Sequence, residues 1–175
     1  VFIEHVGIPT LGALREAVDS LKELNMHRKV QLIVSGGIRS GADVAKAMAM
    51  GADAVSIGSA AMIALNCNAD MYPEDYEKLG TAAGYCHHCH TGKCPVGVAT
   101  QDPELEKRLE PELAGKRVKN YLATLTLELQ TLARANGKSD VRNLEPEDLA
   151  ALTVEAAAMA RVPLAGTNWI PGHKL

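Results

Sequence analysis

The feature that most restricts the fold of this 175-residue chain is a pair of short apolar runs, each ending at a glycine turn. Residues 29–34 (KVQLIV) lead into Ser35-Gly36-Gly37, and residues 54–57 (AVSI) lead into Gly58-Ser59. Short β-branched runs with such boundaries are typical of buried parallel strands. Helix-like sequence follows each turn, and strand, helix, strand, helix at this spacing is a βαβ unit. We therefore expect an α/β fold whose parallel sheet is buried on both faces.

Helical periodicity predicts the elements around these strands. Apolar side chains recur at three- and four-residue intervals over residues 10–23 and 115–136, and Gly137 is suited to end the second of these helices. Ser40 is suited to cap a helix that runs to about Met50 and stops at Gly51. Shorter helices are expected at residues 60–65 and 73–79.

The two ends of the chain are predicted with less regular structure. Residues 1–6 resemble a strand, and residues 162–175, with two Pro and two Gly, should be extended. Pro146 suits the first turn of a last helix that runs to Arg161.

Composition excludes two classes of partner. The net charge is −3, no long run of Lys or Arg occurs, and aromatic residues make up only 3% of the chain, so neither a phosphate-driven nor a stacking nucleic-acid interface is predicted. The apolar stretch at residues 48–65 contains Asp53 and several Gly and Ser, which favours a buried core over a membrane span. No secretory leader is recognisable at the start, and we expect a cytoplasmic protein without a membrane or nucleic-acid partner.

The paired glycine turns indicate a phosphate site. Glycine lets the backbone approach an oxygen-rich ligand closely, and a following helix start offers N–H groups and a positive dipole end. Two such turns lie 21 residues apart, after neighbouring strands. The loops after the last two strands of a (β/α)8 barrel often form a phosphate site of this kind. A tight structural turn would explain either turn alone, but a shared phosphate explains both, so Ser35, Gly36, Gly37, Gly58 and Ser59 are our candidate binding residues.

The cysteines give the most specific pattern. Cys86, Cys89 and Cys94 lie within nine residues, Pro95 follows directly, and Cys67 precedes them across a polar segment. Closely spaced thiolates with a proline after the last one are typical of iron–sulfur loops. Clustering of this kind indicates a metal centre and a reducing compartment rather than a secreted disulfide scaffold.

Other interpretations of the cysteines stay open at this point. Zinc is the rival metal, because His87, His88 and His90 offer nitrogen ligands, although no typical zinc-finger spacing is present. Free or disulfide-bonded cysteines are the third interpretation.

The cysteine-rich segment identifies a family resemblance. Residues 89–103 (CHTGKCPVGVATQDP) closely resemble the iron–sulfur loop of glutamate synthases, and residues 5–9 (HVGIP), 51–52 (GA) and 64–67 (ALNC) are similar to the end of that family's FMN-binding barrel. The resemblance covers roughly residues 1–135. Residues 163–172 (PLAGTNWIPG) look like the shorter stand-alone members, which include the glutamate synthase-like subunit of N-methylglutamate synthase.

The resemblance implies both cofactors and their ligands. The three cluster cysteines of the family fall on Cys67, Cys89 and Cys94, which implies a 3Fe-4S cluster. This chain departs from the family in a longer gap between Cys67 and Cys89, and the extra thiol of Cys86 would allow a 4Fe-4S cluster. The glycine turns would hold the FMN phosphate. The resemblance also implies that residues 1–3 enter a helix rather than a strand.

The implied activity is reductive. In this family ammonia, free or derived from glutamine, adds to 2-oxoglutarate, and reduced FMN delivers hydride to the resulting imine to give L-glutamate, while the cluster passes on electrons from a donor. No catalytic acid or base is recognisable in this chain. The alternatives are an N-methylglutamate synthase subunit, which would use methylamine and glutamate, and a non-catalytic electron-transfer or zinc-binding module.

The expected organisation is the C-terminal portion of an FMN-binding (β/α)8 TIM barrel. Residues 1–66 would be the last βα units, 67–101 the cysteine-rich iron–sulfur loop, 102–161 a helical extension and 162–175 an extended tail. A whole barrel needs ~250 residues, and the chain has no initiator Met. We therefore expect a piece of a larger polypeptide, or a chain that folds against a companion subunit and is inactive alone.

Overall fold

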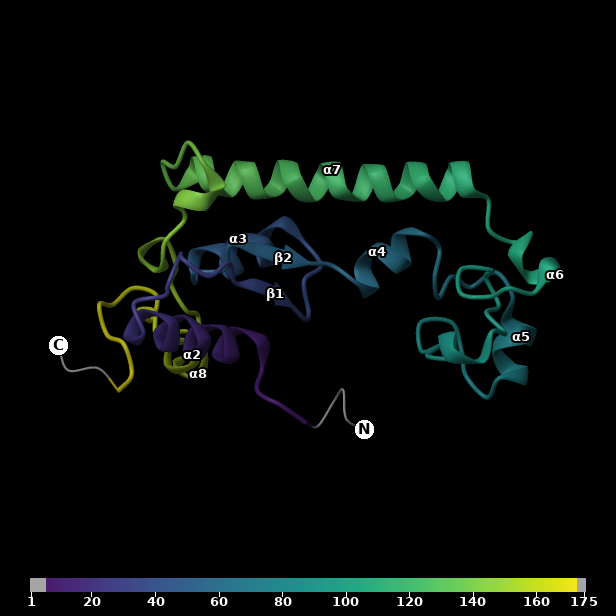
Figure 1. The fold of residues 1–175 in the computed structure, drawn as a ribbon, viewed down its shortest axis with the longest axis horizontal. Helices are drawn as coiled ribbons and strands as arrows, with labels where there is room; N and C mark the ends of the chain where they lie inside the picture. Colours follow the sequence, from purple (N-terminus) through teal and green to yellow (C-terminus); the bar gives the residue numbers. More distant parts are fainter. Residues whose placement is uncertain (1–5, 173–175) are drawn as a thin grey trace. The chain divides into compact units, whose positions relative to one another are not determined.

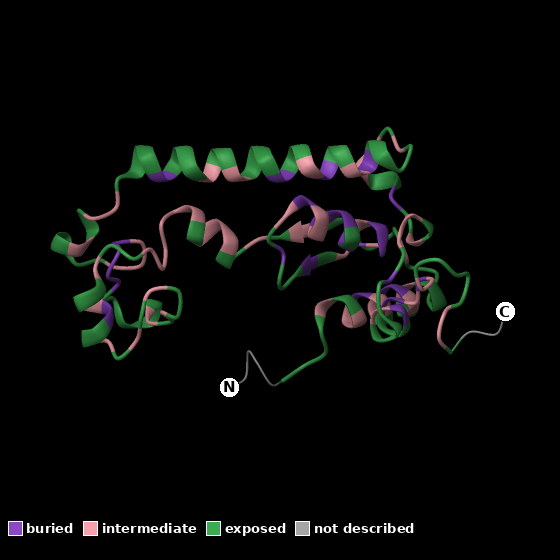
Figure 2. Ribbon diagram, turned by 180° about the vertical axis from the view of Figure 1, so that it is seen from behind, coloured by how far each residue is buried: buried purple, intermediate pink, exposed green. Residues whose placement is uncertain are grey.

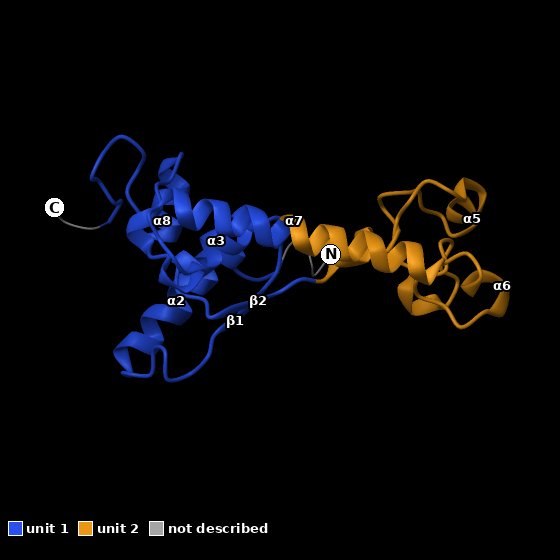
Figure 3. Ribbon diagram, turned by 90° about the horizontal axis from the view of Figure 1, so that it is seen from above, with its two compact units in different colours: residues 1–57, 125–175 blue, residues 58–124 orange. Residues whose placement is uncertain are grey.

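The computed structural model describes residues 6–172 of the chain. Nearly all of the strand or helix expected at residues 1–6 therefore lies outside the described residues. The chain divides into two compact units, one of residues 1–57 and 125–175 and one of residues 58–124 (Figure 3). We call these unit 1 and unit 2.

Unit 1 contains the predicted parallel strand pair. Strand β1 (Ile33–Ser35) pairs in parallel with β2 (Ala54–Ser56), and helix α3 (Gly41–Ala49) connects them (Figure 1). The βαβ unit is thus confirmed. The first strand is shorter than its apolar run, because residues 26–30 form a turn in which the Val30 N–H donates to the Met26 carbonyl at 3.0 Å.

The prediction that both faces of the sheet are buried is wrong for the described residues. Val34 is buried, but Ile33 is 65% exposed and Ser35, Ala54 and Ser56 are also exposed. Figure 2 colours the ribbon by burial, with buried residues in purple and exposed residues in green. Successive side chains of a strand point to opposite faces. One face therefore carries Val34 with its partner Val55, and the other carries the four exposed residues. Helices α2 and α3 contact the strands. Within residues 6–172, no further element covers the face that carries the four exposed residues.

The helices of unit 1 follow the predicted boundaries where local signals are strong. Helix α2 (Thr10–Glu23) has the predicted bounds and buries Leu14 and Val18. In α3 the Ser40 hydroxyl accepts from the Asp43 N–H while the Asp43 carboxylate accepts from the Ser40 N–H, so the predicted cap is confirmed. Helix α7 (Pro111–Ala135) begins four residues before the expected position and is followed by Gly137 with φ +71°.

The single helix predicted for residues 146–161 is wrong. The structure has a 3₁₀ turn η3 (Pro146–Asp148) and a separate helix α8 (Val154–Ala160), and a further 3₁₀ turn η2 (Val141–Asn143) precedes them. Between η3 and α8 the backbone is extended, and Ala151 bonds to the tail: its N–H donates to the Pro163 carbonyl at 2.8 Å and its carbonyl accepts from the Ala165 N–H at 2.8 Å. This pairing with the tail, and the Thr153 hydroxyl that caps α8, interrupt the helical pattern.

Unit 2 is built from short elements. They are α4 (Ser59–Ala64), α5 (Pro73–Lys78), the 3₁₀ turn η1 (Cys89–Thr91), α6 (Pro103–Glu106) and the first part of α7. The short helices expected at 60–65 and 73–79 are confirmed. A small core of Tyr76, Cys94 and Val96 lies between the loops.

No helix among residues 6–172 is long and apolar enough to cross a membrane. Residues 48–65, the stretch that most resembles a span in sequence, form the end of α3, strand β2 and helix α4.

Candidate functional site

All four cysteines lie in unit 2 and all are free thiols. Cys67 and Cys86 are half-buried, Cys89 is exposed at the start of η1, and Cys94 is buried. Cys94 belongs to the small core, and Cys86 packs against that core. Of the four thiols that the sequence singled out, the fold of unit 2 therefore places Cys94 in its small core and Cys86 against it.

Asn68 joins the two ends of the segment that separates Cys67 from Cys86. The Cys86 N–H donates to Asn68 Oδ1 at 2.9 Å, and Asn68 Nδ2 donates to the Cys86 carbonyl at 3.3 Å. The same amide nitrogen lies 3.8 Å from Cys67 Sγ. Asn68 has φ +62°, a left-handed conformation that asparagine tolerates better than most residues. Sequence analysis missed Asn68, although an asparagine directly after a candidate ligand was a usable signal.

The thiol of Cys67 and the phenol of Tyr76 both lie near the other cysteines. Burial raises the pKa of Cys67, and the neighbouring charges of Cys89, Cys94 and Cys86 raise it further. Burial, followed by the charges of nearby cysteines, raises the pKa of Tyr76 to about 12. A cation held among these groups would remove this repulsion between thiolates.

The segment that carries Cys94 is held by two contacts. Arg108 Nη1 donates to the Pro95 carbonyl at 2.7 Å and to Asp75 Oδ2 at 2.7 Å, and its guanidinium lies 4.1 Å from the centre of the Tyr72 ring. Gly97 has φ +76°, and a Cβ there would lie 3.0 Å from the Leu109 nitrogen and still closer to the Leu105 carbonyl oxygen. Residues 94–97 are all buried, so this segment has little freedom to move away from the core.

The donor set of unit 2 fits a thiolate-bound centre in chemical type. Thiolates select iron–sulfur clusters and zinc. Among the described residues, however, no three His, Cys, Asp or Glu side chains stand in an arrangement that could hold a metal ion. The candidate zinc ligands His87 and His88 are stacked at 4.7 Å between ring centres, and His88 is stacked on His90 at 6.1 Å.

The first glycine turn follows β1 and has a backbone that suits glycine. Gly36 has φ +120° and Gly37 φ +73°, and a Cβ at Gly36 would lie 2.8 Å from Thr10 Oγ1. Within the described residues, no acceptor takes a hydrogen bond from the N–H of Gly36 or Gly37. Ser35, the last residue of β1, is exposed. The turn therefore offers two N–H donors to an oxygen-rich ligand, with open space beside Gly37 and the Thr10 hydroxyl beside Gly36.

The start of helix α3, in contrast, is already occupied by carboxylates. The Arg39 and Ser40 N–H groups both donate to Asp43 Oδ2 at 3.1 Å, and the Gly41 N–H donates to Glu128 Oε2 at 2.7 Å. A phosphate at this turn would therefore be bound by the Gly36 and Gly37 backbone rather than by the α3 helix start.

The second glycine turn follows β2. Gly58 is the N-cap residue of α4, Ser59 is its first residue, and a Cβ at Gly58 would meet no atom within 4 Å. The register pairs Ser35 with Ser56, so the two strands end side by side. That the two turns share one phosphate remains a prediction.

Comparison with known proteins places these features in a family. The family model described as a conserved region in glutamate synthase matches residues 1–139. A glutamate synthase large subunit-like protein of Rhizobium meliloti (strain 1021) is 64% identical over 172 residues, which cover 98% of this chain and 39% of that protein.

Two further relatives carry glutamate synthase in their names. An archaeal glutamate synthase (NADPH) of Methanocaldococcus jannaschii is 42% identical over 144 residues, which cover 82% of this chain and 25% of the relative. A ferredoxin-dependent glutamate synthase of Cyanidium caldarium is 36% identical over 152 residues, which cover 81% of this chain and 8% of the relative. The chain thus spans well under half of the length of the curated relatives it matches, and it belongs to the glutamate synthase family.

Proposed function

We propose that this chain forms the C-terminal part of the FMN and iron–sulfur synthase domain of a glutamate synthase-type oxidoreductase, which makes L-glutamate from 2-oxoglutarate. The observation that supports this most directly is the family match over residues 1–139, since that range includes both βα units and the complete cysteine-rich segment. We place the enzyme in the cytoplasm, where thiols stay reduced.

The exposed side of the strand pair supports a larger barrel. Ile33 and Ala54 are paired in register and both are exposed. Beside β1 lies a hollow of about 270 Å³ whose lining includes Ile8, Leu14 and Ile33. We propose that the remaining strands of a (β/α)8 barrel, from the same polypeptide or a companion subunit, cover this face and this edge.

The turn after β1 supports the flavin assignment. Gly36 and Gly37 offer backbone N–H groups, and Ser35 stands beside them with its side chain exposed. We propose that these residues, with Gly58 and Ser59, hold the FMN phosphate. Their part is to bind and orient, because the redox chemistry belongs to the cofactor.

The small core of unit 2 supports a cluster. Units of this size often need a metal or a disulfide to supplement their hydrophobic core, and two of the free thiols, Cys94 and Cys86, lie in and against the Tyr76, Cys94 and Val96 core. We propose that Cys67, Cys89 and Cys94 ligate a 3Fe-4S cluster and that Cys86 is either an additional ligand of a 4Fe-4S cluster or a neighbour. Asn68 would hold Cys67 and Cys86 in position, and Arg108 the Cys94 segment.

The cofactors, when bound, would supply electrons and a hydride for the reduction of an imine formed from 2-oxoglutarate and ammonia. The relatives' names specify NADPH in one case and ferredoxin in another. We therefore leave the electron donor open and test both.

The experiment uses the whole protein that contains this chain, purified without oxygen. We expect flavin absorbance, iron with acid-labile sulfide, and glutamate formation from 2-oxoglutarate with glutamine or ammonia in the presence of NADPH or reduced ferredoxin. Cys94→Ser should remove iron and activity, whereas Cys86→Ser should retain most of both. Zinc without iron or flavin would refute the proposal and favour the zinc-binding alternative, and turnover of methylamine with glutamate would favour the N-methylglutamate synthase alternative.

A further inference from the structure

Basic side chains gather around one hollow of unit 1 that the proposed function does not use. The hollow has a volume of about 430 Å³ and is lined by residues of α2, the turn after it, the end of α3 and the C-terminal segment. Its basic residues are Arg15, Lys22, His27, Arg28 and Arg161. We call this hollow the Arg15 pocket.

Arg15 is the central feature, because part of its guanidinium is buried without a partner. Its Nε and Nη1 atoms are inaccessible to solvent and find no acceptor among the described residues. The side chain is only 15% exposed, and its nearest carboxylate oxygen, Asp19 Oδ1, lies 3.6 Å from Nη2. Asp19 is also bonded by Arg161 Nη1. A buried charged donor that lacks an acceptor is costly, so the charge of Arg15 is incompletely paired by the described residues.

The charge of the lining favours an anion. Four permanent cations line the pocket against two carboxylates, Glu145 and Glu147. Arg161 is paired with Asp19 and Glu145 with Lys138, which leaves Lys22, Arg28 and the incompletely paired Arg15 against Glu147. The pKa of His27 agrees with a positive surrounding. Burial lowers this pKa, the charges of Lys22 and Arg28 lower it further, and the charge of Asp53 opposes them only in part.

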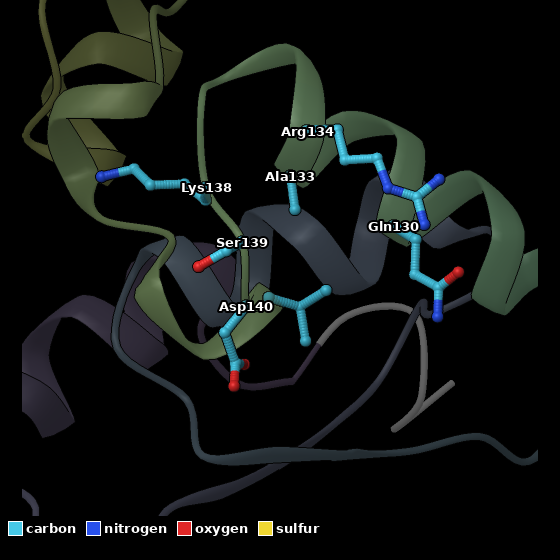
Figure 4. Close-up of a pocket in the computed structure, with 7 residues that line it drawn as sticks. Gln130, Ala133, Arg134, Lys138, Ser139 and Asp140 are labelled. Atoms are coloured by element: carbon cyan, nitrogen blue, oxygen red, sulfur yellow. The ribbon is translucent and has the colours of Figure 1, made fainter.

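The pocket differs from a second hollow of the same unit. That hollow, of about 240 Å³, is lined by seven residues between Gln130 and Val141 (Figure 4). Its Lys138 is held by Glu145 and Asp148, each at 3.3 Å, and its Asp140 is held by Arg142. Two of its charged groups, Lys138 and Asp140, are thus already paired within the protein.

The Arg15 pocket is also separate from the glycine turns. His27 and Arg28 precede β1, and Gly51 precedes β2, whereas the proposed flavin turns follow the same two strands. The pocket therefore lies toward the opposite ends of the strands from the turns that would hold FMN.

We propose that the Arg15 pocket binds a small molecule through a phosphate or carboxylate group, with the half-buried Arg15 as the inner contact and Lys22 and Arg28 as the outer contacts. Arginine suits such a group, because its fork of N–H donors matches two oxygens of a phosphate or carboxylate. The volume falls in the range of small-molecule sites. The apolar part of the lining, which includes Val18, Met50 and Ile170, would contact the body of the molecule.

Calorimetric titration of the whole protein tests this proposal, with inorganic phosphate in one arm and succinate in the other, at constant ionic strength in chloride. We expect saturable binding in at least one arm, and the stronger arm identifies the group as phosphate or carboxylate. Arg15→Met keeps the length of the side chain and removes its donors, and it should weaken binding by about tenfold or more.

Arg28→Ala guards against a folding defect in the Arg15 variant, since Arg28 is exposed, and it should weaken binding several-fold. Lys29→Ala is the matched control: Lys29 is the exposed neighbour of Arg28 and does not line the pocket, so this variant should bind as the unaltered protein does. The proposal is overturned if neither anion binds saturably. It is also overturned if Arg15→Met and Arg28→Ala bind as tightly as Lys29→Ala, because binding would then lie elsewhere, for example at the Gly36 and Gly37 turn.

Discussion

The two units of this chain are stabilised in different ways. Unit 1 buries regular stripes of apolar residues, such as Leu14 and Val18 on α2 and Leu125 and Leu129 on α7. Unit 2 buries little beyond Tyr76, Ala114 and residues 94–97. Its helices α4, α5 and α6 have only four to six residues, which is too short to be stable without tertiary contacts. Unit 2 therefore depends on individual contacts, and each of them should matter more.

One kind of contact occurs in both units and allows a matched test. Gly41 of unit 1 and Gly97 of unit 2 each lie against the backbone of another segment. A Cβ at Gly41 would lie 2.6 Å from the Leu129 nitrogen, and one at Gly97 would lie 3.0 Å from the Leu109 nitrogen. Only Gly97 also has a positive φ, of +76°. The steric clash is tighter at Gly41, whereas the positive φ occurs only at Gly97, so the two substitutions weigh a steric clash against backbone strain.

The largest effect is expected for Gly97→Ala. The new methyl group would collide with the Leu105 carbonyl, and the left-handed backbone adds a cost that alanine cannot avoid. We expect a loss of about 3 kcal/mol or more in the stability of unit 2, measured by native-state hydrogen exchange of the amides around Tyr76 and Val96.

Gly92→Ala is the control for this prediction. Gly92 has φ +72°, but a Cβ at this position would meet no atom within 4 Å, so this variant isolates the backbone cost, which should be about 1 kcal/mol. Equal losses for the two variants would mean that the close approach at Gly97 is relieved by a small shift of α6.

Gly41→Ala should have the next largest effect, and it should appear in unit 1. The clash involves the backbone of α7 near Leu125 and Leu129, and a shift there would also lengthen the 2.7 Å bond from the Gly41 N–H to Glu128. We expect a loss of about 2 kcal/mol, below that of Gly97→Ala because the φ of Gly41 is helical.

Gly115→Ala is the control for this prediction. Gly115 lies in an open position of α7, so this variant should instead stabilise the protein by up to about 1 kcal/mol. A larger loss of stability for Gly41→Ala than for Gly97→Ala would contradict the expectation that single contacts matter more in unit 2 than in unit 1.

Arg108→Lys should have an intermediate effect in unit 2. Arg108 bonds Asp75 and Pro95 at once and lies over the Tyr72 ring, and a lysine cannot make all three contacts. We expect a loss of about 1–2 kcal/mol and weaker iron retention in the whole protein. Lys107→Ala is the control, since the Lys107–Glu104 pair is equally short at 2.6 Å but largely exposed, and it should change stability by less than about 0.5 kcal/mol. If the two variants are equally mild, Arg108 does not hold the Cys94 segment.

The same contrast explains how far sequence alone could predict this structure. The bounds of α2 and the cap and stop of α3 at Ser40 and Gly51 were predictable, because their signals lie within a few residues of the element. The parallel pairing of β1 and β2 was also predictable, since a βαβ unit admits few topologies. The cysteine segment was identified through its residue types and its family resemblance.

The remainder depends on contacts between distant residues. The break after Asp148 arises from backbone bonds between Ala151 and the tail at Pro163 and Ala165, and no helical period can reveal them. The same holds for the Asn68 contact with Cys86, 18 residues away, and for the half-buried Arg15. The exposed face of the sheet was mispredicted because a buried-strand pattern does not say which segment covers it.

The smallest of the four effects is expected for Asp43→Asn, which removes the charge of the side chain that caps α3. Its dependence on pH should distinguish this capping contact from the apolar packing around it. Burial alone would raise the pKa of Asp43, but hydrogen bonds from Arg39 and Ser40, with the charge of Lys46, lower it below the ordinary value. A lowered pKa means that the ionised form stabilises the folded state above the unfolded pKa of about 3.9, and that this contribution is lost as the pH falls through the folded pKa. Asp43→Asn should therefore cost about 1 kcal/mol near neutral pH, and the difference from the unaltered protein should shrink in acid. Denaturant unfolding at a series of pH values measures this difference, and a gap that stays constant into acid would show that the charge of Asp43 contributes nothing beyond its shape.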